Sequence, residues 1–355
     1  MKLRDLKYMA AYLVPVTCLV GLHFGGWMAP GVLYFGFILV PLIELFVPAS
    51  IYSENEEALK IKSGKAFFDV LLYLNVPFVY FIIGYFIWLL GHRNWTTAEL
   101  IFTVLNVGVM LGVSCINVAH ELGHRQRSLD RWMARLLLVP ALYSHFTIEH
   151  NYGHHLHVAT PEDPATARKN QPIYLFFLRS IGLSYRNAWR IVNRMLVSKN
   201  QGFWKNEIIW GHVAQLILLI IVFKVAGLTG VIAYLCAALV GIMALESVNY
   251  IEHYGLRRRR LPSGRFEPMR ESHSWNSNHE LGRIVLFELV RHTDHHYQTT
   301  RKYQTLRHLD KSPQLPFGYP MSIMIAFVGH SPVASSCRYI LVPCFICYSI
   351  SPLSS

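Results

Sequence analysis

Six long apolar stretches constrain this chain more than any other feature of its sequence. A helix of about 20 apolar residues crosses the ~30 Å hydrocarbon core of a bilayer. Because backbone groups find no partners in lipid, such segments form helices rather than open strands. We therefore predict an all-α membrane protein with about six transmembrane helices, at residues 8–29, 31–48, 67–90, 98–119, 208–226 and 229–248.

The composition agrees with this class. Hydrophobic residues make up 53% of the chain and charged residues only 15%, against about 25% charged residues in soluble domains. The first stretch is too long for a cleavable signal peptide and lacks a small-residue cleavage pattern. The six cysteines are scattered, which excludes a secreted disulfide framework and a four-cysteine metal site.

Lysine and arginine predict the orientation, because they accumulate in loops that stay in the cytoplasm. Twelve of them lie between Arg125 and Lys205, whereas the opposite loops hold chiefly Arg93 and Lys224. Both termini and residues 120–206 and 249–320 are then cytoplasmic. The net charge of +12 follows mostly from this bias. A basic patch for an acidic partner at residues 257–260 is the alternative interpretation.

No internal repeat or low-complexity segment divides the chain. We therefore predict one integral-membrane domain over residues 1–355, in which the two cytoplasmic intervals form a helical cap. Residues 321–355 form a tail whose stretch 339–350 is predicted as an interfacial helix or a partial span.

Histidine is distributed unevenly. Of the eighteen histidines, seven lie between His120 and His157 and seven between His253 and His308. Both blocks fall on the predicted cytoplasmic side, beside the ends of apolar stretches. Three motifs stand out, namely His120-Glu-Leu-Gly-His124, His150-Asn-Tyr-Gly-His154-His155 and His292-Thr-Asp-His295-His296. Such clustering at a membrane edge indicates metal binding rather than ordinary buried histidines.

The spacing of the histidines predicts two metal ions. Residues three or four apart share one face of a helix, so His120 and His124 can point at one centre. His150 and His154 are predicted to repeat that geometry, with His155 turned by about 100° toward a second metal. Eight imidazoles exceed the coordination of one ion. Ligand type alone does not choose among iron, copper, zinc and nickel.

The order of these motifs resembles that of the integral-membrane non-haem di-iron desaturases and hydroxylases. More specifically, Asn249-Tyr-Ile-Glu-His-Tyr-Gly255 is similar to the hydrocarbon-hydroxylase signature of the bacterial alkane 1-monooxygenases, and the three histidine motifs and Leu315-Pro-Phe-Gly-Tyr-Pro320 are similar to other segments of that family. The resemblance covers about residues 1–320, and the tail departs from the family's pattern.

The resemblance implies a di-iron site with nine histidine ligands, of which His253 comes from the signature and not from spacing. The implied ligands are His120, His124, His150, His154, His155, His253, His292, His295 and His296. A ligating imidazole usually donates its other N–H to an acceptor. Neighbouring acids are therefore candidates for such contacts, namely Glu121, Glu149, Glu252 and Asp294.

The implied reaction is oxygen-dependent terminal hydroxylation of alkanes to primary alcohols, with O2 as co-substrate. The family resemblance implies electrons from rubredoxin and its NAD(P)H-dependent reductase, because the chain itself lacks a rubredoxin cysteine pattern and a dinucleotide fingerprint. We further expect that the alkane enters from the lipid bilayer, that the protein lies in a bacterial inner membrane and that its active site is on the cytoplasmic side. No nucleic-acid partner is expected.

Three alternatives stay open at this stage. A membrane fatty-acid desaturase shares the type of site, but its histidine motifs usually differ in spacing and it lacks the signature around His253. A xylene-type alkyl-aromatic methyl hydroxylase shares much of that signature. A metal transporter would need ligands along a path through the membrane, whereas these histidines cluster on one predicted side.

Overall fold

The computed structural model describes residues 3–328, and the predicted segment 339–350 lies outside them. Within this range no β-strand forms, and only two isolated β-bridges occur. The all-α class is thereby confirmed. The helices are α1 Leu13–Phe24, α2 Gly31–Leu33, α3 Val40–Phe46, α4 Glu56–Ser63, α5 Ala66–Tyr73, α6 Asn75–His92, α7 Thr97–Met110, α8 Asn117–Gly123, α9 Ser128–Leu138, α10 Phe146–Glu149, α11 His155–His157, α12 Ile173–Ser198, α13 Glu207–His253, α14 Glu280–Val285, α15 His292–Tyr297 and α16 Tyr319–Val328.

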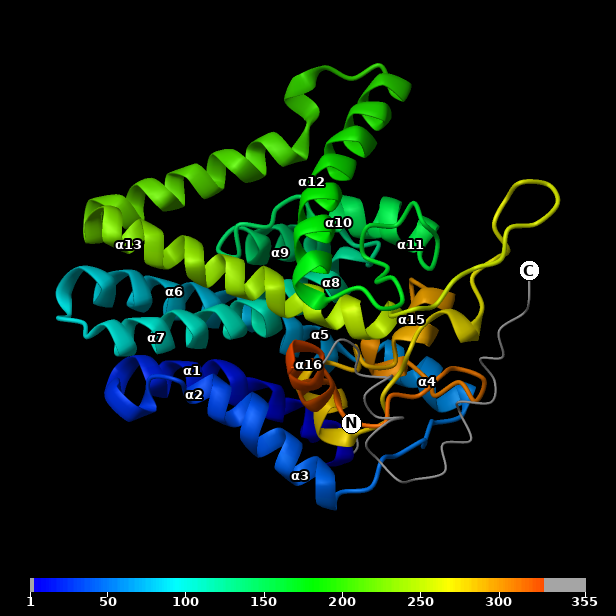
Figure 1. Ribbon diagram of the computed structural model, residues 1–355, viewed down its shortest axis with the longest axis horizontal. Helices are drawn as coiled ribbons and strands as arrows, with labels where there is room; N and C mark the ends of the chain where they lie inside the picture. Colours follow the sequence, from blue (N-terminus) through cyan, green and yellow to red (C-terminus); the bar gives the residue numbers. More distant parts are fainter. Residues whose placement is uncertain (1–2, 329–355) are drawn as a thin grey trace.

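Four helical segments within residues 3–328 are long and apolar enough to cross a membrane, namely Leu3–Phe24, Ala66–His92, Thr97–Gly123 and Glu207–His253. The last has 47 residues and is broken at Gly227, whose φ of 63° suits glycine. Figure 1 shows the two arms of α13 that meet at this break, and they correspond to the predicted spans 208–226 and 229–248. The predicted second span falls on the shorter apolar helix Gly31–Phe46, so the count of six spans stays a prediction.

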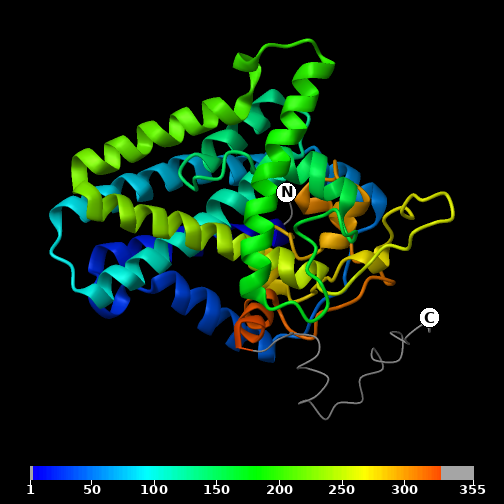
Figure 2. The same cartoon turned by 45° about the horizontal axis from the view of Figure 1, so that its top comes forward.

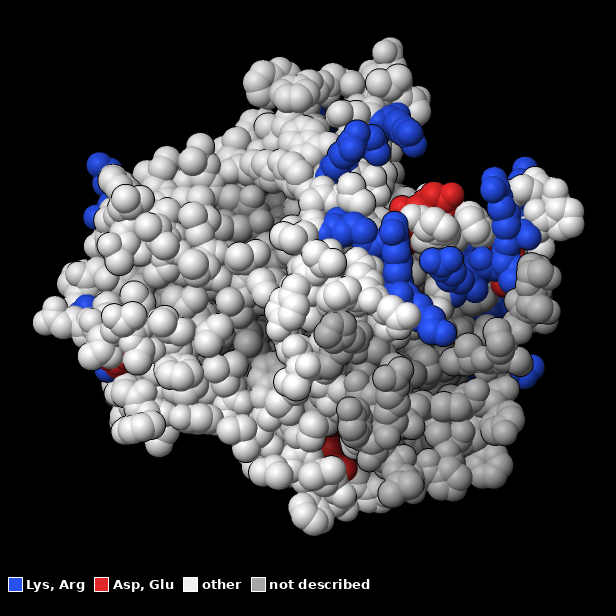
Figure 3. Space-filling model, in the orientation of Figure 1, with Lys and Arg blue, Asp and Glu red and all other residues white. Residues whose placement is uncertain are grey.

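The outer surface of the helical body is apolar. On the first arm of α13 the side chains of Leu216, Ile217 and Ile220 are each at least half exposed. An exposed apolar surface of this extent is typical of contact with lipid or with another protein. In Figure 3 the larger part of the molecule carries few charged residues, and Lys and Arg gather at the end that holds α11 and α15. This distribution agrees with a membrane-embedded body and one charged face.

Small residues bring α7 and α13 close together. A Cβ built on Gly241 of α13 would lie 3.0 Å from the carbonyl oxygen of Gly108. The next turn repeats the approach, because a Cβ on Gly112 would lie 2.9 Å from the Cβ of Ala244. Such close backbone packing is common between membrane helices. The two helices run in the same direction here. The helical run Thr97–Gly123, which continues from α7 into α8, and α13 therefore carry His120 and His253 toward the same end of the molecule.

That end is built from segments far apart in the sequence. The helices α8, α10, α11 and α15 lie beside the end of the second arm of α13 in Figure 1. Figure 2 shows α12 rising from this end to the turn that begins α13. Arg291, next to α15, donates to the carbonyl oxygens of Leu306 and Tyr52, each at 2.7 Å. These contacts fix the loop segments around the histidine-bearing helices.

Candidate metal centre

Four elements supply the histidines of the predicted site. His120 lies in the last turn of α8 and His124 follows it directly. His253 is the last residue of α13, at the C-terminal end of a long apolar helix. The other two motifs lie on short helices, namely the π-helical segment His150–His154 with α11 after it, and α15. The structure brings all nine predicted histidines into two neighbouring groups.

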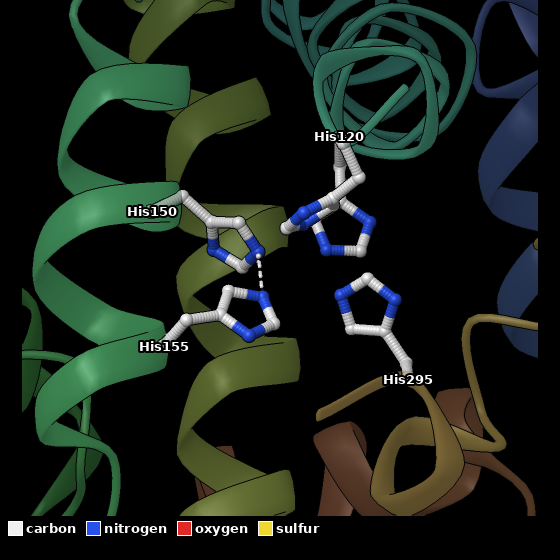
Figure 4. A group of neighbouring side chains, drawn as sticks. His120, His150, His155 and His295 are labelled. Carbon is white, nitrogen blue, oxygen red and sulfur yellow. Dashed lines mark hydrogen bonds between the residues drawn. The ribbon is translucent and has the colours of Figure 1, made fainter. Parts of the chain in front are cut away.

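The first group, hereafter the five-histidine group, consists of His120, His124, His150, His155 and His295, with one ring nitrogen of each within 4.8 Å of the others. Figure 4 shows the rings of His120, His150, His155 and His295 facing a common point. The Nε2 atoms of His150 and His155 are 3.0 Å apart. His124 and His155 are only partly buried, so this group reaches the surface.

The second group, hereafter the four-histidine group, consists of His154, His253, His292 and His296, all of them buried. The Nε2 atom of His292 lies 3.2 Å from that of His253 and 2.9 Å from that of His296. Three ring nitrogens therefore converge from α13 and α15. The rings of His155 and His296 are 4.3 Å apart between centroids, so the two groups adjoin.

The division of the second motif corrects a prediction. Spacing predicted that His150 and His154 point at one centre, but His150 lies with His155 in the five-histidine group and His154 lies in the other. The reason is local. Residues His150–His154 form a π-helical turn, in which hydrogen bonds join residues five apart. The wider turn aligns His150 with His155 instead. His120 and His124 share one group, as their spacing predicts.

The ring nitrogens fit metal ions. Among the residues that the structure describes, eight of the nine histidines have a buried ring nitrogen without a hydrogen-bond partner, the exception being His150. Burial, and then neighbouring imidazoles, hold the pKa values of His295 and His296 well below the usual range, so both rings are neutral at pH 7. Buried polar atoms normally find partners, and neutral imidazoles are metal ligands. Two ions would satisfy those of these nitrogens that are Nε2 atoms, namely those of His120, His124, His154 and His295. In His155, His253, His292 and His296 the atom that faces the other histidines is also Nε2, so each ring would bind an ion through Nε2.

Asp163 is a contact of the site that the sequence analysis missed. Its Oδ2 atom accepts from His154 Nδ1 at 2.9 Å and from Thr166 Oγ1 at 2.6 Å. A carboxylate at this position fixes the ring and leaves its Nε2 atom free to bind a metal. Asp163 lies in a loop nine residues after His154, and neither helical spacing nor adjacency pointed to it.

The four acids predicted beside the histidines divide into two kinds. Glu252 lies at the site, with its Oε2 atom 3.1 Å from His292 Nε2. Glu121 and Asp294 instead bind arginines. Glu121 Oε1 accepts from Arg125 at 3.1 and 3.0 Å, and Asp294 accepts from Arg307 at 2.9 and 3.0 Å.

Glu149 is the fourth of these acids. It lines a small cavity together with Tyr143, His145 and Glu246, next to His150 and His154. Burial, and secondarily Asp163, raise the pKa of Glu149 to about 8. Its carboxyl group is therefore mainly protonated at pH 7, unlike those that bind arginine.

The remaining histidines of the two dense blocks lie outside both groups. His145 packs between Tyr143 and Tyr185. The others contact polar neighbours, namely His157 with Glu162, His273 with Glu267, His279 with Ser277, and His308 with Asn278. Sequence context left these residues out of the site, and the structure gives each of them another contact.

An apolar cavity of about 310 Å³ lies among the membrane helices. Its walls come from α1, the apolar helix Gly31–Phe46, α7 and the π-helical segment that follows it, the second arm of α13, α14 and α16. The lining is almost entirely aliphatic and aromatic, for example Phe35, Val109 and Val285. Tyr319 also lines it, and the Tyr319 hydroxyl donates to Glu252 Oε1 at 2.7 Å. Glu252 therefore joins the cavity wall to the four-histidine group.

The chain is similar to known proteins over most of its length. A model of the fatty acid desaturase family matches residues 94–323. An alkane 1-monooxygenase of Pseudomonas putida is 36% identical over 322 residues, which cover 88% of this chain and 80% of the relative. Alkane 1-monooxygenase 1 of Alcanivorax borkumensis is 36% identical over 331 residues, covering 90% of this chain and 81% of the relative. More distant is the xylene/toluene monooxygenase hydroxylase component of Pseudomonas putida, 27% identical over 323 residues, 86% of this chain and 81% of the relative.

Proposed function

Since the chain belongs to the fatty acid desaturase family and, within it, to the alkane 1-monooxygenases, we propose that it hydroxylates the terminal carbon of alkanes to primary alcohols at a histidine-ligated di-iron centre. The observation that carries the proposal is the pair of histidine groups, whose buried ring nitrogens converge beside an apolar cavity.

The proposed ligands are the members of the two groups. The five-histidine group would hold one iron and the four-histidine group the other. Two iron ions bound there would supply the reductive activation of O2 that an unactivated C–H bond requires, because no side chain can perform this chemistry. Asp163 would keep His154 in the tautomer that presents Nε2 to the metal.

The apolar cavity is the proposed binding site for the alkane. An alkane offers no polar handle, so shape and the exclusion of water must position it. Phe35 and Phe37 of the second apolar helix and Val248 of α13 belong to the lining. Because Tyr319 stands at the wall that leads to Glu252 and His292, a chain in the cavity would present one end to the metals. Positioning would then select the terminal carbon.

Electrons would come from rubredoxin and its NAD(P)H-dependent reductase. Two observations support delivery at the charged end. His124 and His155 of the five-histidine group are only partly buried, and Lys and Arg gather at that end in Figure 3. A basic face attracts an acidic electron carrier and speeds its docking. The same charge bias supports a bacterial inner-membrane location with the site on the cytoplasmic side.

The proposal is tested with membranes that contain the full chain, supplied with rubredoxin, its reductase, NADH, O2 and alkanes of several lengths. We expect primary alcohols and about two irons per chain, and we expect no turnover when rubredoxin is omitted. The His253→Ala variant, which removes one member of the four-histidine group, should lose iron and activity together.

Other outcomes would overturn the proposal. Zinc at full occupancy, or olefinic products without alcohol, would contradict alkane hydroxylation at iron. Faster oxidation of methylbenzenes than of any alkane would favour the xylene-type reaction instead. Turnover with iron and NADH alone would contradict the dependence on rubredoxin.

A further inference from the structure

Glu252 is one residue from the end of α13 and has a fully buried side chain. Its two carboxylate oxygens have different surroundings. Oε1 accepts from the Tyr319 hydroxyl at 2.7 Å. Within residues 3–328, Oε2 finds no hydrogen-bond partner, although it lies 3.1 Å from His292 Nε2. The Oε2 atom therefore approaches this nitrogen without forming a hydrogen bond.

His292 Nε2 has other close neighbours besides Glu252. His292 Nε2 is also the atom that His253 Nε2 and His296 Nε2 approach, at 3.2 and 2.9 Å. Four potential ligand atoms, three nitrogens and one carboxylate oxygen, thus gather at one place. His292 Nε2 carries either one N–H or one lone pair and can satisfy only one of these neighbours, whereas a shared cation would attract all four atoms.

The charge of Glu252 also favours a cation at this place. A carboxyl group this deeply buried is neutral unless a positive charge lies beside it, and a metal ion at Oε2 would supply that charge. Imidazoles that bind a metal do so in their neutral form, so the four-histidine group supplies no negative charge to balance a cation. In contrast, Glu121, which lies next to His120, is already paired with Arg125.

We propose that Glu252 is itself a ligand of the metal held by the four-histidine group. This inference rests on the proposed di-iron function. The metal there would have four nitrogens and one oxygen as ligands, whereas the five-histidine group offers five nitrogens. The two positions would then be chemically unequal, and an anionic oxygen ligand stabilises the more highly charged state of the ion that it binds.

The two proposed metal positions also differ in what lies beside them. Tyr319 lines the apolar cavity and holds Oε1 of the same carboxylate, so the metal with the carboxylate ligand is the one connected to the cavity wall. Tyr319 is in this view a positioning residue, which orients Glu252 so that Oε2 faces the histidines. The five-histidine group reaches the surface at His124 and His155 instead.

The test uses full-length Glu252→Gln protein grown with ⁵⁷Fe, with iron content and Mössbauer spectra as readouts that do not depend on turnover. We expect either a fall of about half in iron per chain or a change confined to one of the two iron components. A variant that keeps both irons with wild-type spectra would overturn the proposal. Because the wild-type protein is measured alongside, its lack of iron would refute the di-iron function itself, which is a different result.

Two further variants make the result specific. Glu246→Gln removes another buried carboxylate of α13, one that accepts from Tyr143 and Ser180, and it should keep both irons and the wild-type spectrum. Iron loss in this control equal to that in Glu252→Gln would overturn the assignment. Where Glu252→Gln does not accumulate, Tyr319→Phe should keep both irons and shift only one component, and an unshifted spectrum counts against the proposal.

Discussion

The five-histidine and the four-histidine groups are built from the same residue type, yet their surroundings differ. The first is partly exposed at His124 and His155, and its neighbouring acid Glu121 binds Arg125. The second is wholly buried, and two carboxylates, Asp163 and Glu252, contact its histidines. One group thus reaches the surface, and the other is joined to the wall of the apolar cavity through Glu252 and Tyr319. Under the proposed function the two metal positions would serve separate tasks, electron delivery at the five-histidine group and substrate contact at the four-histidine group.

Removing one histidine from each group is expected to have the largest effect. In His292→Ala and in His124→Ala, iron content should fall by about half and alkane oxidation by more than about 100-fold, since a lost ligand outweighs a lost contact to a ligand. Mössbauer spectra should show that each variant loses a different component. His145→Ala, which removes a buried histidine outside both groups, should keep both irons. Loss of the same component in both variants would contradict two separate positions.

The acids beside the two groups give the next largest effect. Asp163→Asn replaces the carboxylate that binds His154, so we expect about a 10- to 100-fold loss of iron affinity or activity. Asp294→Asn, which changes an acid paired with Arg307, should lower iron affinity far less. Iron titration of the two apoproteins compares them directly. Equal losses of iron affinity in the two variants would show that contact between a carboxylate and a histidine does not account for the effect.

Narrowing the cavity should have a smaller and selective effect. Gly36 lines the cavity, and a Cβ built there meets nothing within 4 Å. Gly36→Val should therefore reduce oxidation of the longest accepted alkanes by roughly 10-fold while shorter alkanes and iron content are unaffected. Gly84→Val is a matched control, because Gly84 is exposed and has equally open surroundings. A uniform loss for all chain lengths would contradict a substrate role for this cavity.

The smallest effect on catalysis is expected at Glu288, an acid that serves the fold. Burial alone would raise its pKa, but Arg283 and Arg291 outweigh burial and lower the pKa to about 2 from 4.5. A carboxylate with a depressed pKa in the folded state stabilises the protein above its unfolded pKa, here by roughly 3 kcal/mol. That stability is lost as the pH falls from about 4.5 toward 2.

The measurement is the midpoint of thermal unfolding in detergent as a function of pH. Glu288→Gln should unfold at a lower temperature than wild type at pH 7, and the gap should narrow as the pH falls below about 4.5. Glu57→Gln, which changes an exposed acid of α4, should show no gap. If the difference in unfolding midpoint between Glu288→Gln and wild type does not depend on pH, the shape of the side chain rather than its charge accounts for the difference.

Much of the fold follows from the sequence because apolar length and helical structure are local properties. The predicted spans 67–90 and 98–119 fall within Ala66–His92 and Thr97–Gly123. The predicted boundary between the last two spans falls at the break at Gly227. The second span is the weaker case, since the helix Gly31–Phe46 is shorter than the others, and its crossing of the membrane stays a prediction.

The sequence pointed to the histidines that the structure brings together, but not to how they are grouped. Spacing pointed to the three histidine motifs, and resemblance to a known signature added His253, which now lies with His154, His292 and His296. No sequence pattern pointed to Asp163, because its contact with His154 depends on how the loop that contains it folds. The four adjacent acids looked alike in sequence, yet Glu252 faces a histidine whereas Asp294 faces arginines.

The sequence by itself determined that the chain is helical, that it has membrane-length apolar segments and that imidazole is concentrated at their ends, because each of these depends on residues near one another in the chain. Only the tertiary structure decided which histidines share a group, which carboxylates reach them and where the cavity lies. Those outcomes depend on a π-helical turn at His150–His154 and on packing between α7, α13, α15 and α16, whose residues are distant in sequence and meet only when the helices assemble.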